Sequence, residues 1–288
     1  MKTSTAYNYS QRVMRVQSFI QNNLDTQLLL EELAEVAMMS PYHFHRVFRD
    51  MVGEPIKVYI RRLRLEKAAM QLRFTNISLK RIAVDAQYNT TEAFNRAFKN
   101  RFDVTPAAYR EQYRNIVANH RNDFVTSDDP YQKFREMEVE ITHVEQMTVA
   151  YIRQDGPFKA LAHHFETLHE WLSSQDLDTS NRRHIGLIGG YPPISDNEYV
   201  FCDACIEVDS NIKGHEIIGV RTILKGKYAV VELENATESR RSELFGWLLE
   251  EWLSIQQLEL DMRPWLVEYA SNNPSEQAIK VFMPIRGA

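Results

Sequence analysis

Between residues 30 and 114, apolar residues recur at helical spacing and are interrupted by short polar turns. Residues Leu30–Ala37 and Leu79–Ala86 are predicted as short amphipathic helices, because apolar positions recur there every three or four residues. Each is followed by a turn of three or four residues and then by a second helix with one apolar face. A longer helix is predicted between the two pairs, over residues 56–74. The pattern therefore predicts an all-α N-terminal domain.

The two helix pairs are copies of one another at an offset of 50 residues. The matched positions are Phe44/Phe94, Arg46/Arg96, Phe48/Phe98, Arg49/Lys99 and Tyr59/Tyr109. A helix, a short turn and a second helix make up the helix-turn-helix motif, whose second helix enters the major groove of DNA. The sequence therefore predicts two tandem helix-turn-helix units.

The second helix of each unit combines a capped start, a buried face and an exposed polar face. Ser40 and Thr90 are predicted N-caps whose hydroxyls accept from first-turn amides, and Pro41 suits the first helical position. Phenylalanines four residues apart fix each helix to its partner. An alternative role for Arg46 is an ion pair with Asp50, one turn along. The exposed faces are predicted to contact bases and phosphates of double-stranded DNA through Tyr42, His45, Arg46, Arg49, Thr91, Glu92, Asn95, Arg96 and Lys99.

The predicted connecting helix, residues 56–74, is almost as long as one turn of DNA. At about 1.5 Å per residue it spans nearly 30 Å, against ~34 Å between successive major-groove segments. We therefore expect one molecule to span both segments as a monomer. Arg61, Arg62, Arg64 and Lys67 make this helix basic, and the simpler interpretation of any one of them is a solvated surface charge.

The pattern changes in the second half of the chain. Residues 115–136 lose clear periodicity and contain Ser127-Asp128-Asp129-Pro130, which predicts a linker between domains at 1–114 and 137–288. The order strand, strand, helix, strand, strand then occurs twice, which predicts an α+β domain of duplicated β-β-α-β-β units with pseudo-two-fold symmetry. Ligand pockets commonly form at such internal interfaces. The predicted elements cover residues 137–143, 148–154, 159–174 (helix), 185–191 and 199–208, then 217–224, 227–233, 238–257 (helix), 265–270 and 278–285.

The net charge of −5 conceals an asymmetry between the two parts. Residues 1–120 hold 18 Lys and Arg against 11 Asp and Glu, a net of +7, whereas residues 121–288 hold 16 against 28, a net of −12. A basic first part is expected where only that part meets phosphate. No apolar run approaches the ~18 residues that span a membrane, and the N-terminus lacks a secretory signal. We therefore expect a cytoplasmic protein without a membrane partner.

Cys202 and Cys205 are the two cysteines, and they lie in a predicted strand. Their separation of three residues places the thiols on opposite faces of the strand, so we expect free thiols. No histidine set completes a tetrahedral metal site, and no nucleophile–base arrangement is detectable in the sequence. We expect no metal, no cofactor and no enzymatic activity.

The repeated residues resemble the AraC/XylS family of transcription regulators, and more closely its monomeric MarA/Rob-type members. The resemblance includes Phe102-Asp103-Val104-Thr105-Pro106, followed by Tyr109-Arg110. It implies RNA polymerase as a partner, activation of transcription and association with the nucleoid. His45 and Glu92 stand where relatives often carry Gln, so the operator sequence does not carry over. By the same resemblance, bases are read by Tyr42, His45 and Arg46 in the first unit and by Thr91, Glu92 and Arg96 in the second.

The second half resembles the GyrI-like effector-binding domain. The residues that carry the resemblance are Val149-Ala150-Tyr151-Ile152, Gly156-Pro157-Phe158, Trp171, Phe245-Gly246-Trp247, Trp252 and Val281-Phe282-Met283-Pro284-Ile285. The family implies a cleft that binds amphipathic, often cationic, molecules with aromatic walls and a buried carboxylate. The matching carboxylate is Glu268, and the aromatic candidates are Tyr151, Tyr191, Tyr228 and Trp265.

Two departures from the GyrI-like pattern bear on the ligand. Ala270 stands where relatives usually place a tyrosine, and Lys280 replaces a second glutamate. A lysine there can pair with Glu268 and neutralise it, or shift preference toward anionic or zwitterionic ligands. The sequence therefore predicts a DNA-binding transcription regulator, favoured as an activator, whose C-terminal domain binds a small effector. The alternatives are a GyrI-like hydrolase of small electrophiles and a protein-interaction module.

Overall fold

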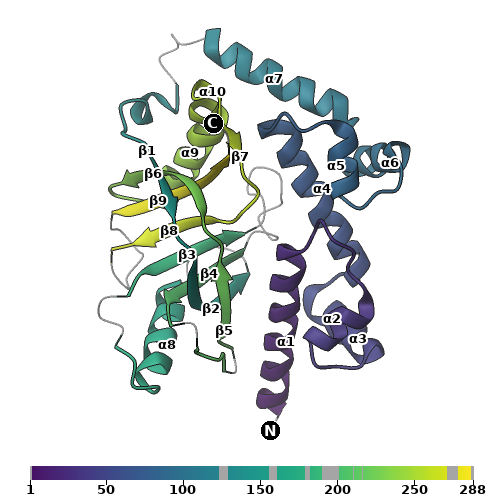
Figure 1. Cartoon of the computed structure of the whole chain (residues 1–288), viewed down its shortest axis with the longest axis vertical. Helices are drawn as coiled ribbons and strands as arrows, with labels where there is room; N and C mark the ends of the chain where they lie inside the picture. The colour runs from purple at the N-terminus through teal and green to yellow at the C-terminus, as the bar shows by residue number, and fades with distance from the viewer. Residues whose placement is uncertain are drawn as a thin grey trace. The chain divides into compact units, whose positions relative to one another are not determined.

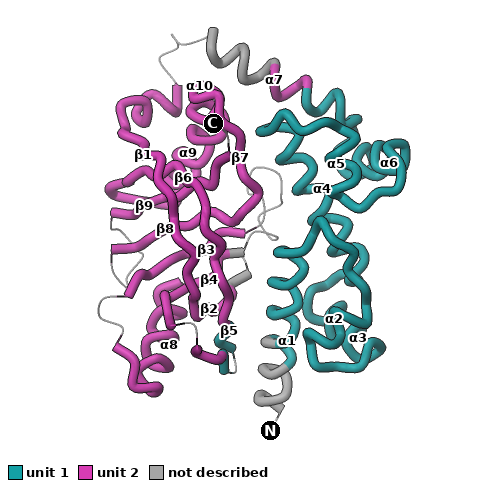
Figure 2. The backbone as a smooth tube through the Cα atoms, viewed as in Figure 1, with its two compact units in different colours: residues 1–110, 214–219 teal, residues 111–213, 220–288 magenta. Residues whose placement is uncertain are grey.

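The computed structural model describes residues 2–122, 129–155, 161–178, 182–189, 201–209, 211–215, 217–270 and 278–286. Figure 2 shows two compact units, residues 1–110 with 214–219 and residues 111–213 with 220–288. The first unit is helical and the second is built on a β-sheet, as the sequence predicts.

The described residues up to 122 form seven helices (Figure 1). Their bounds are α1 Lys2–Asn22, α2 Leu30–Val36, α3 Pro41–Val52, α4 Ile56–Phe74, α5 Leu79–Asp85, α6 Thr91–Phe102 and α7 Pro106–Asn122. The predicted helices Leu30–Ala37 and Leu79–Ala86 are confirmed to within one residue, a second helix follows each of them, and the connecting helix α4 has the predicted ends. Helix α1 has no counterpart in the sequence prediction. Its Val16 and Ile20 are fully buried, and they belong to the same apolar cluster as α2 and α3.

The two helix pairs share one packing scheme, carried by residues at the 50-residue offset. Phe44 and Phe48 are fully buried with ring centroids 5.7 Å apart, and Phe94 and Phe98 repeat both features at the same distance. The next ring along follows suit. Phe48 meets Tyr59 edge-on at 5.3 Å, and Phe98 meets Tyr109 edge-on at 5.4 Å. The repeat in sequence is thus a repeat in structure.

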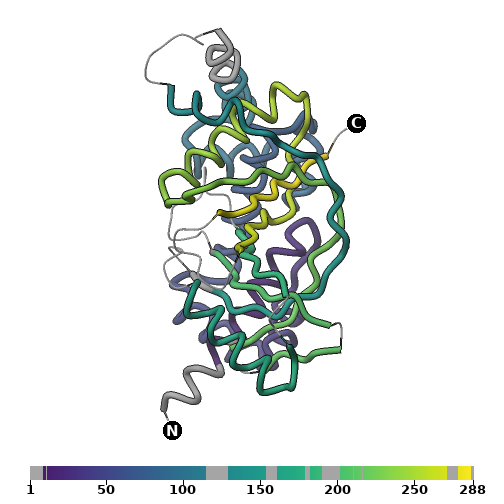
Figure 3. The backbone as a smooth tube through the Cα atoms, turned by 90° about the vertical axis from the view of Figure 1, so that its left-hand side faces the viewer, coloured from purple at the N-terminus to yellow at the C-terminus, as the bar shows by residue number. Residues whose placement is uncertain are grey.

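The second unit is an antiparallel sheet with helices on one face (Figure 1). Its elements are η1 Gln132–Phe134, β1 Glu140–Val144, β2 Met147–Asp155, α8 Leu161–Ser173, β3 His184–Gly189, β4 Phe201–Glu207, β5 Gly219–Ile223, β6 Gly226–Leu233, α9 Glu238–Trp247, η4 Leu248–Trp252, α10 Leu253–Ile255, β7 Glu259–Leu260, β8 Trp265–Tyr269 and β9 Ile279–Arg286. The strand order is β1-β6-β9-β8-β3-β4-β2-β5, with β7 paired to β9. Strands β8 and β9, in yellow tones in Figure 3, run side by side.

Alternation along the strands separates the two faces of this sheet. Toward the helices, Phe165 of α8 meets Tyr269 of β8 at 5.8 Å between ring centroids, and Phe245 of α9 meets Trp265 at 5.0 Å. The opposite face carries its own buried apolar cluster, which we call the open-face cluster. Its members are Val144, Met147, Val149, Tyr151, Ile185, Leu187, Cys205, Ile223, Tyr228, Leu266 and Phe282, with Val230 packed against them.

Two elements of the second unit differ from the sequence prediction. The predicted helix over residues 238–257 contains a π-helical turn, Leu248–Trp252, between α9 and α10. The short strand β7 is an addition, and it pairs with the end of β9. Neither a π turn nor a two-residue strand produces a periodic pattern long enough to detect in a sequence.

The stretch predicted as a linker, residues 115–136, has more structure than that prediction gives it. Helix α7 continues to Asn122, and Phe134 is fully buried against Trp247 with ring centroids 6.0 Å apart. Arg135 adds an ion pair with Glu251, 2.7 Å between Nε and Oε1. Residues 129–136 therefore pack on the second unit because one aromatic ring and one arginine find partners on its helices. In the described part of the chain, no helix is long and apolar enough to cross a membrane.

Candidate nucleic-acid interface and candidate ligand face

Helix α3 buries its phenylalanines and exposes the face predicted to contact DNA. Tyr42 is 83% exposed, Arg46 and Arg49 are exposed, and His45 is half-buried. Among the described residues, the polar partner of Arg46 is His43, with Nη2 and Nδ1 3.4 Å apart, rather than Asp50. The guanidinium is therefore not tied to a carboxylate on its own helix, and it can turn toward a base or a phosphate.

Helix α6 presents a similar but less basic face. Glu92, Arg96 and Lys99 are exposed, and Thr91 is half-buried. Asn95 is also half-buried, and its Oδ1 is buried without a hydrogen-bond partner among the described residues. The five side chains thus lie on one helix, and the acceptor oxygen of Asn95 is shielded from solvent.

We call α3 and α6, the second helices of the two helix-turn-helix units, the reading helices. Their starts differ in a way that the sequence did not predict. Thr90 Oγ1 accepts a hydrogen bond from the Ala93 amide at 3.1 Å, as predicted. Ser40 has the extended backbone of an N-cap, yet its side chain makes no capping hydrogen bond. The capping prediction is therefore wrong for the Ser40 hydroxyl, because the exposed start of α3 leaves its first amides to solvent. Pro41 stands at the start of the helix as predicted.

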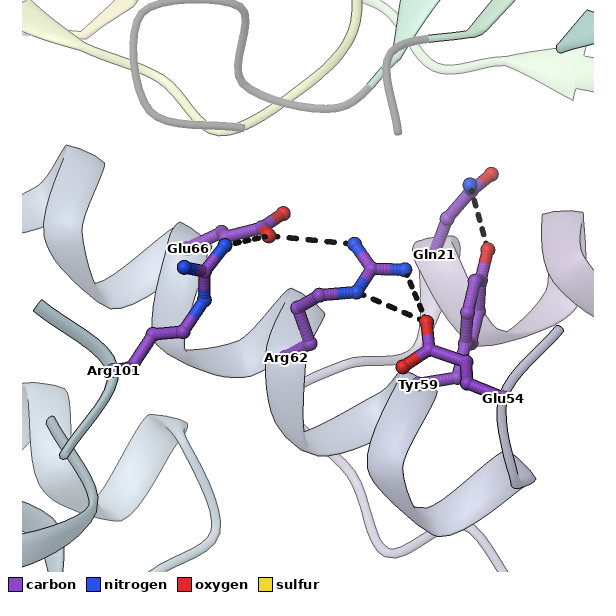
Figure 4. Close-up of polar contacts among 6 residues, drawn as sticks. All are labelled: Gln21, Glu54, Tyr59, Arg62, Glu66 and Arg101. Atoms are coloured by element: carbon purple, nitrogen blue, oxygen red, sulfur yellow. Dashed lines mark hydrogen bonds and ion pairs between the residues drawn. The ribbon is translucent and has the colours of Figure 1, made fainter. Parts of the chain in front are cut away.

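A chain of charged side chains joins the two helix-turn-helix units through the connecting helix (Figure 4). Arg62 donates to Glu54 Oε1 from Nε at 3.0 Å and from Nη2 at 2.6 Å, and its Nη1 lies 3.3 Å from Glu66 Oε1. The same Glu66 oxygen is 3.6 Å from Arg101 Nη2 at the end of α6. Glu66 is fully buried. We call Glu54, Arg62, Glu66 and Arg101 the ion chain.

The ion chain corrects the prediction for the basic side chains of α4. Arg62 is buried rather than solvated. Burial lowers the pKa of Arg62, but the hydrogen bond to Glu54 and the charges of Glu66 and Glu54 outweigh it, so that the pKa is raised overall. Arg64 donates to the backbone carbonyls of Leu24 at 2.8 Å and Thr26 at 2.6 Å. Of the four, Arg61 is exposed, as expected for a solvated side chain, and Lys67 is half-buried.

The candidate ligand residues of the second unit do not all lie together. Glu268, Tyr151 and Tyr228 share the open face of the sheet, and Glu268 and Tyr151 lie in one cross-strand row through Ile185 and Cys205. Trp265 points to the other face, where it packs on Phe245 of α9. The last candidate, Tyr191, lies outside the described residues.

Glu268 is paired with an arginine that the sequence did not single out. Arg183 donates to Glu268 Oε1 from Nε at 2.7 Å and to Oε2 from Nη2 at 3.1 Å. Lys280 lies opposite Glu268 on the neighbouring strand, but its Nζ is 2.6 Å from Glu232 Oε1. The sequence offered Lys280 as a partner that neutralises Glu268. In the structure Arg183 is that partner, and Lys280 pairs with Glu232 instead.

A second charged group is buried on the open face, beside Tyr151. Arg153 and Asp203 are directly opposite one another on β2 and β4 and form two hydrogen bonds, at 2.8 and 3.0 Å. Arg221 of β5 donates at 3.0 Å to Asp203 Oδ2, the oxygen that also accepts from Arg153 Nη2, and the Arg221 guanidinium lies 5.6 Å from the centroid of the Tyr151 ring. Tyr151 is therefore held between strands by charge as well as by apolar packing.

Two family models match this chain. A helix-turn-helix domain matches residues 33–112, and a GyrI-like small-molecule-binding domain matches residues 137–286, which is more than half of the chain. The chain belongs to the GyrI-like family and carries an AraC-type helix-turn-helix domain. Both resemblances predicted from the sequence are confirmed.

Among curated relatives, the AraC-type part is similar to three proteins. The transposon Tn10 TetD protein of Escherichia coli is 40% identical over 92 residues, 32% of this chain and 67% of TetD. The transcriptional regulator Rob of Salmonella typhimurium is 39% identical over 92 residues, 32% of each chain. The transcriptional activator AarP of Providencia stuartii is 36% identical over 92 residues, 32% of this chain and 68% of AarP. The similarity to Rob thus spans about a third of that protein.

The GyrI-like domain also settles the prediction for the cysteines. Cys202 and Cys205 are free and fully buried. Cys202 lies on the helix side near Gly186 and Tyr269, and Cys205 belongs to the open-face cluster, so the thiols lie on opposite faces as predicted. Burial raises the pKa of both thiols and keeps them protonated. Among the described residues, no group of three or more His, Cys, Asp and Glu side chains could hold a metal ion.

Proposed function

We propose that this protein is a monomeric transcription regulator that places α3 and α6 in two successive major-groove segments of one operator. The observation that carries the proposal is the repeat itself, because residues 50 apart build the same aromatic packing and leave a polar face exposed on each reading helix. The 19 residues of α4 between them span about 28 Å, close to one DNA turn.

We assign the DNA contacts to the exposed face of each reading helix. Tyr42, His45 and Arg46 are proposed to read bases in the first segment, and Thr91, Glu92 and Arg96 in the second. Arg49, Asn95 and Lys99 are proposed to bind phosphates or sugars and so to set the position of each helix. Glu92 favours a cytosine, whose amino group donates to a carboxylate.

We propose that residues 137–288 form the effector-binding domain and that residues 115–136 link it to the DNA-binding domain. The effector is proposed to be a small amphipathic molecule that binds at the open face. Support for a duplicated β-β-α-β-β architecture comes from the strand order. Exchanging β1, β2, β3 and β4 with β5, β6, β8 and β9 reverses the order β1-β6-β9-β8-β3-β4-β2-β5, as a pseudo-two-fold axis through the β8–β3 pair requires. Effector binding is proposed to shift the population of conformers competent for DNA or RNA polymerase.

Activation of transcription, contact with RNA polymerase and a place at the nucleoid in the cytoplasm follow from the same proposal. A hydrolase role for the GyrI-like domain gains no support from the open face. Its candidate carboxylate, Glu268, is paired with Arg183, and Ala270, directly after β8, carries no hydroxyl.

Selection of bound sequences from a random pool of duplex DNA tests the DNA-reading proposal. We expect the enriched sequences to hold two different blocks whose centres are ~10 base pairs apart. The Arg46→Ala variant should lose the preference in one block and the Arg96→Ala variant in the other. A single enriched block that only one of the two variants erases would show that only one helix reads DNA.

A further inference from the structure

Glu268, the carboxylate that the GyrI-like resemblance places in the ligand site, is paired with Arg183 of the same chain. Arg183 grips both oxygens of Glu268, and its guanidinium lies 5.8 Å from the centroid of the Phe282 ring. A third side of the guanidinium faces Met147, whose Sδ is 3.8 Å from Nη1. A planar, delocalised cation is thus held between a carboxylate, an aromatic ring and a thioether.

This ion pair lies beside the open-face cluster and is partly exposed to solvent. Phe282 and Met147 belong to the open-face cluster, and Ile185 lies directly opposite Glu268 on β3. The side chains of Arg183 and Glu268 remain 32% and 24% exposed, so solvent and small solutes reach them. The pKa of Arg183 is raised, chiefly because its side chain donates hydrogen bonds to Glu268. Burial acts in the opposite direction, and the negative charges of Glu268 and Glu207 raise the pKa further.

The charged neighbours do not compete for Glu268. Lys280, on the next strand, is engaged by Glu232, and it is about half exposed. Arg263 lies over Tyr228 at 4.7 Å and donates to the backbone carbonyls of Lys225 and Lys227. Glu268 therefore has one strong cationic partner among these residues, and that partner is Arg183.

We propose that Arg183 is an internal ligand that fills the cation position of the effector site. This inference rests on the proposed effector-binding function and specifies the ligands that the site accepts. An amphipathic cation must displace the guanidinium from Glu268 before it can bind, whereas an amphipathic anion meets the positive charge of Arg183 without displacing anything. The native site thus selects amphipathic anions over cations, and removal of Arg183 uncovers a cation site.

Two ions of nearly the same size and shape, tetraphenylphosphonium and tetraphenylborate, separate charge from hydrophobicity in the test. Binding of each to the full-length protein is measured by titration calorimetry. We expect the native protein to bind the borate more tightly. In Arg183→Gln, affinity for the phosphonium should rise at least tenfold and affinity for the borate should fall, so that the preference reverses.

Two further variants show whether the gain belongs to the uncovered carboxylate. Lys280→Gln removes a positive charge beside Glu268 without removing its partner, and it should leave phosphonium affinity within twofold of the native value. The double variant Arg183→Gln/Glu268→Gln should lose the gain of the single variant. Because both side chains are partly exposed, we expect folded variants, which thermal unfolding verifies.

The outcomes separate the inference from the proposal beneath it. If both ions bind and Arg183→Gln leaves their ratio unchanged, or if Lys280→Gln matches its gain, the internal-ligand role is wrong and effector binding stands. If neither ion binds to the native protein or to any variant, the cation position does not exist and the open face is not the effector site.

Discussion

The two helix-turn-helix units are the same inside and different outside. Phe48 packs on Tyr59 in the first helix-turn-helix unit, and Phe98 packs on Tyr109 in the second helix-turn-helix unit. The two ring distances agree to 0.1 Å. Their exposed faces have diverged. The first presents Tyr42, His45, Arg46 and Arg49, and the second presents Thr91, Glu92, Asn95, Arg96 and Lys99. A repeated core fixes the geometry of reading, and unlike surfaces make the two halves of the operator unlike.

The link between the units is itself unlike a solvated connector. The ion chain begins at Glu54 after the first reading helix, runs through Arg62 and Glu66 of α4, and ends at Arg101 of the second reading helix. We infer that the ion chain fixes the angle between the two helix-turn-helix units, since Glu66 is fully buried and contacts both arginines (Figure 4). A buried carboxylate with two cationic partners is costly to disturb.

The largest expected effect comes from breaking this link. Glu66→Ala should lower the free energy of unfolding by about 3 kcal/mol, because it leaves buried positive charge without its partner. The estimate is at the low end for a buried pair, since Arg62 keeps Glu54 and Arg101 is a third exposed. Urea unfolding measures the loss. Glu31→Ala, at an exposed position of α2, is the matched control and should change stability by less than about 0.5 kcal/mol. Equal losses in the two variants would refute a structural role for the ion chain.

The next effect compares the two reading helices through their matched arginines. Arg46→Ala and Arg96→Ala should each weaken binding to the selected operator by ~1–3 kcal/mol. Each loss should disappear when the block read by that helix is scrambled, and should persist when the other block is scrambled. Gel-shift titration at fixed salt measures this. If scrambling either block removes the losses of both variants alike, the helices do not read separate segments.

Helix capping gives a smaller contrast between the units. Thr90→Ala should cost about 1 kcal/mol of stability, because it removes the hydrogen bond to the Ala93 amide. Ser40→Ala should cost less than about 0.5 kcal/mol, since the Ser40 hydroxyl makes no capping bond. Thermal unfolding of the two variants side by side measures the difference. A larger loss in Ser40→Ala would show that its hydroxyl caps α3 in solution.

Local patterns in the sequence predict most of the helical unit. The ends of α4 follow from apolar spacing, and the repeat predicts both helix pairs because Phe44 and Phe94 occupy the same place in each. The direction of Arg62 does not follow from local pattern. Helical spacing cannot tell a solvated arginine from one whose partner, Glu54, lies outside the helix.

The ligand face is harder to predict for the same physical reason. Arg183 and Glu268 are 85 residues apart, and they meet because β3 pairs with β8 in the middle of the sheet. Strand alternation does place Glu268 and Trp265 on opposite faces, a conclusion available from their spacing of three residues. The family resemblance grouped them by type, and the register of the sheet separates them.

The central claim is that one molecule reads two DNA segments at a spacing fixed by α4. The most direct test measures affinity for the selected operator after insertion of five base pairs between its two blocks. The account predicts that affinity falls to the level of an operator with one scrambled block, because a helix of about 28 Å cannot follow the second block half a turn around the duplex. Undiminished affinity for the lengthened operator would contradict it.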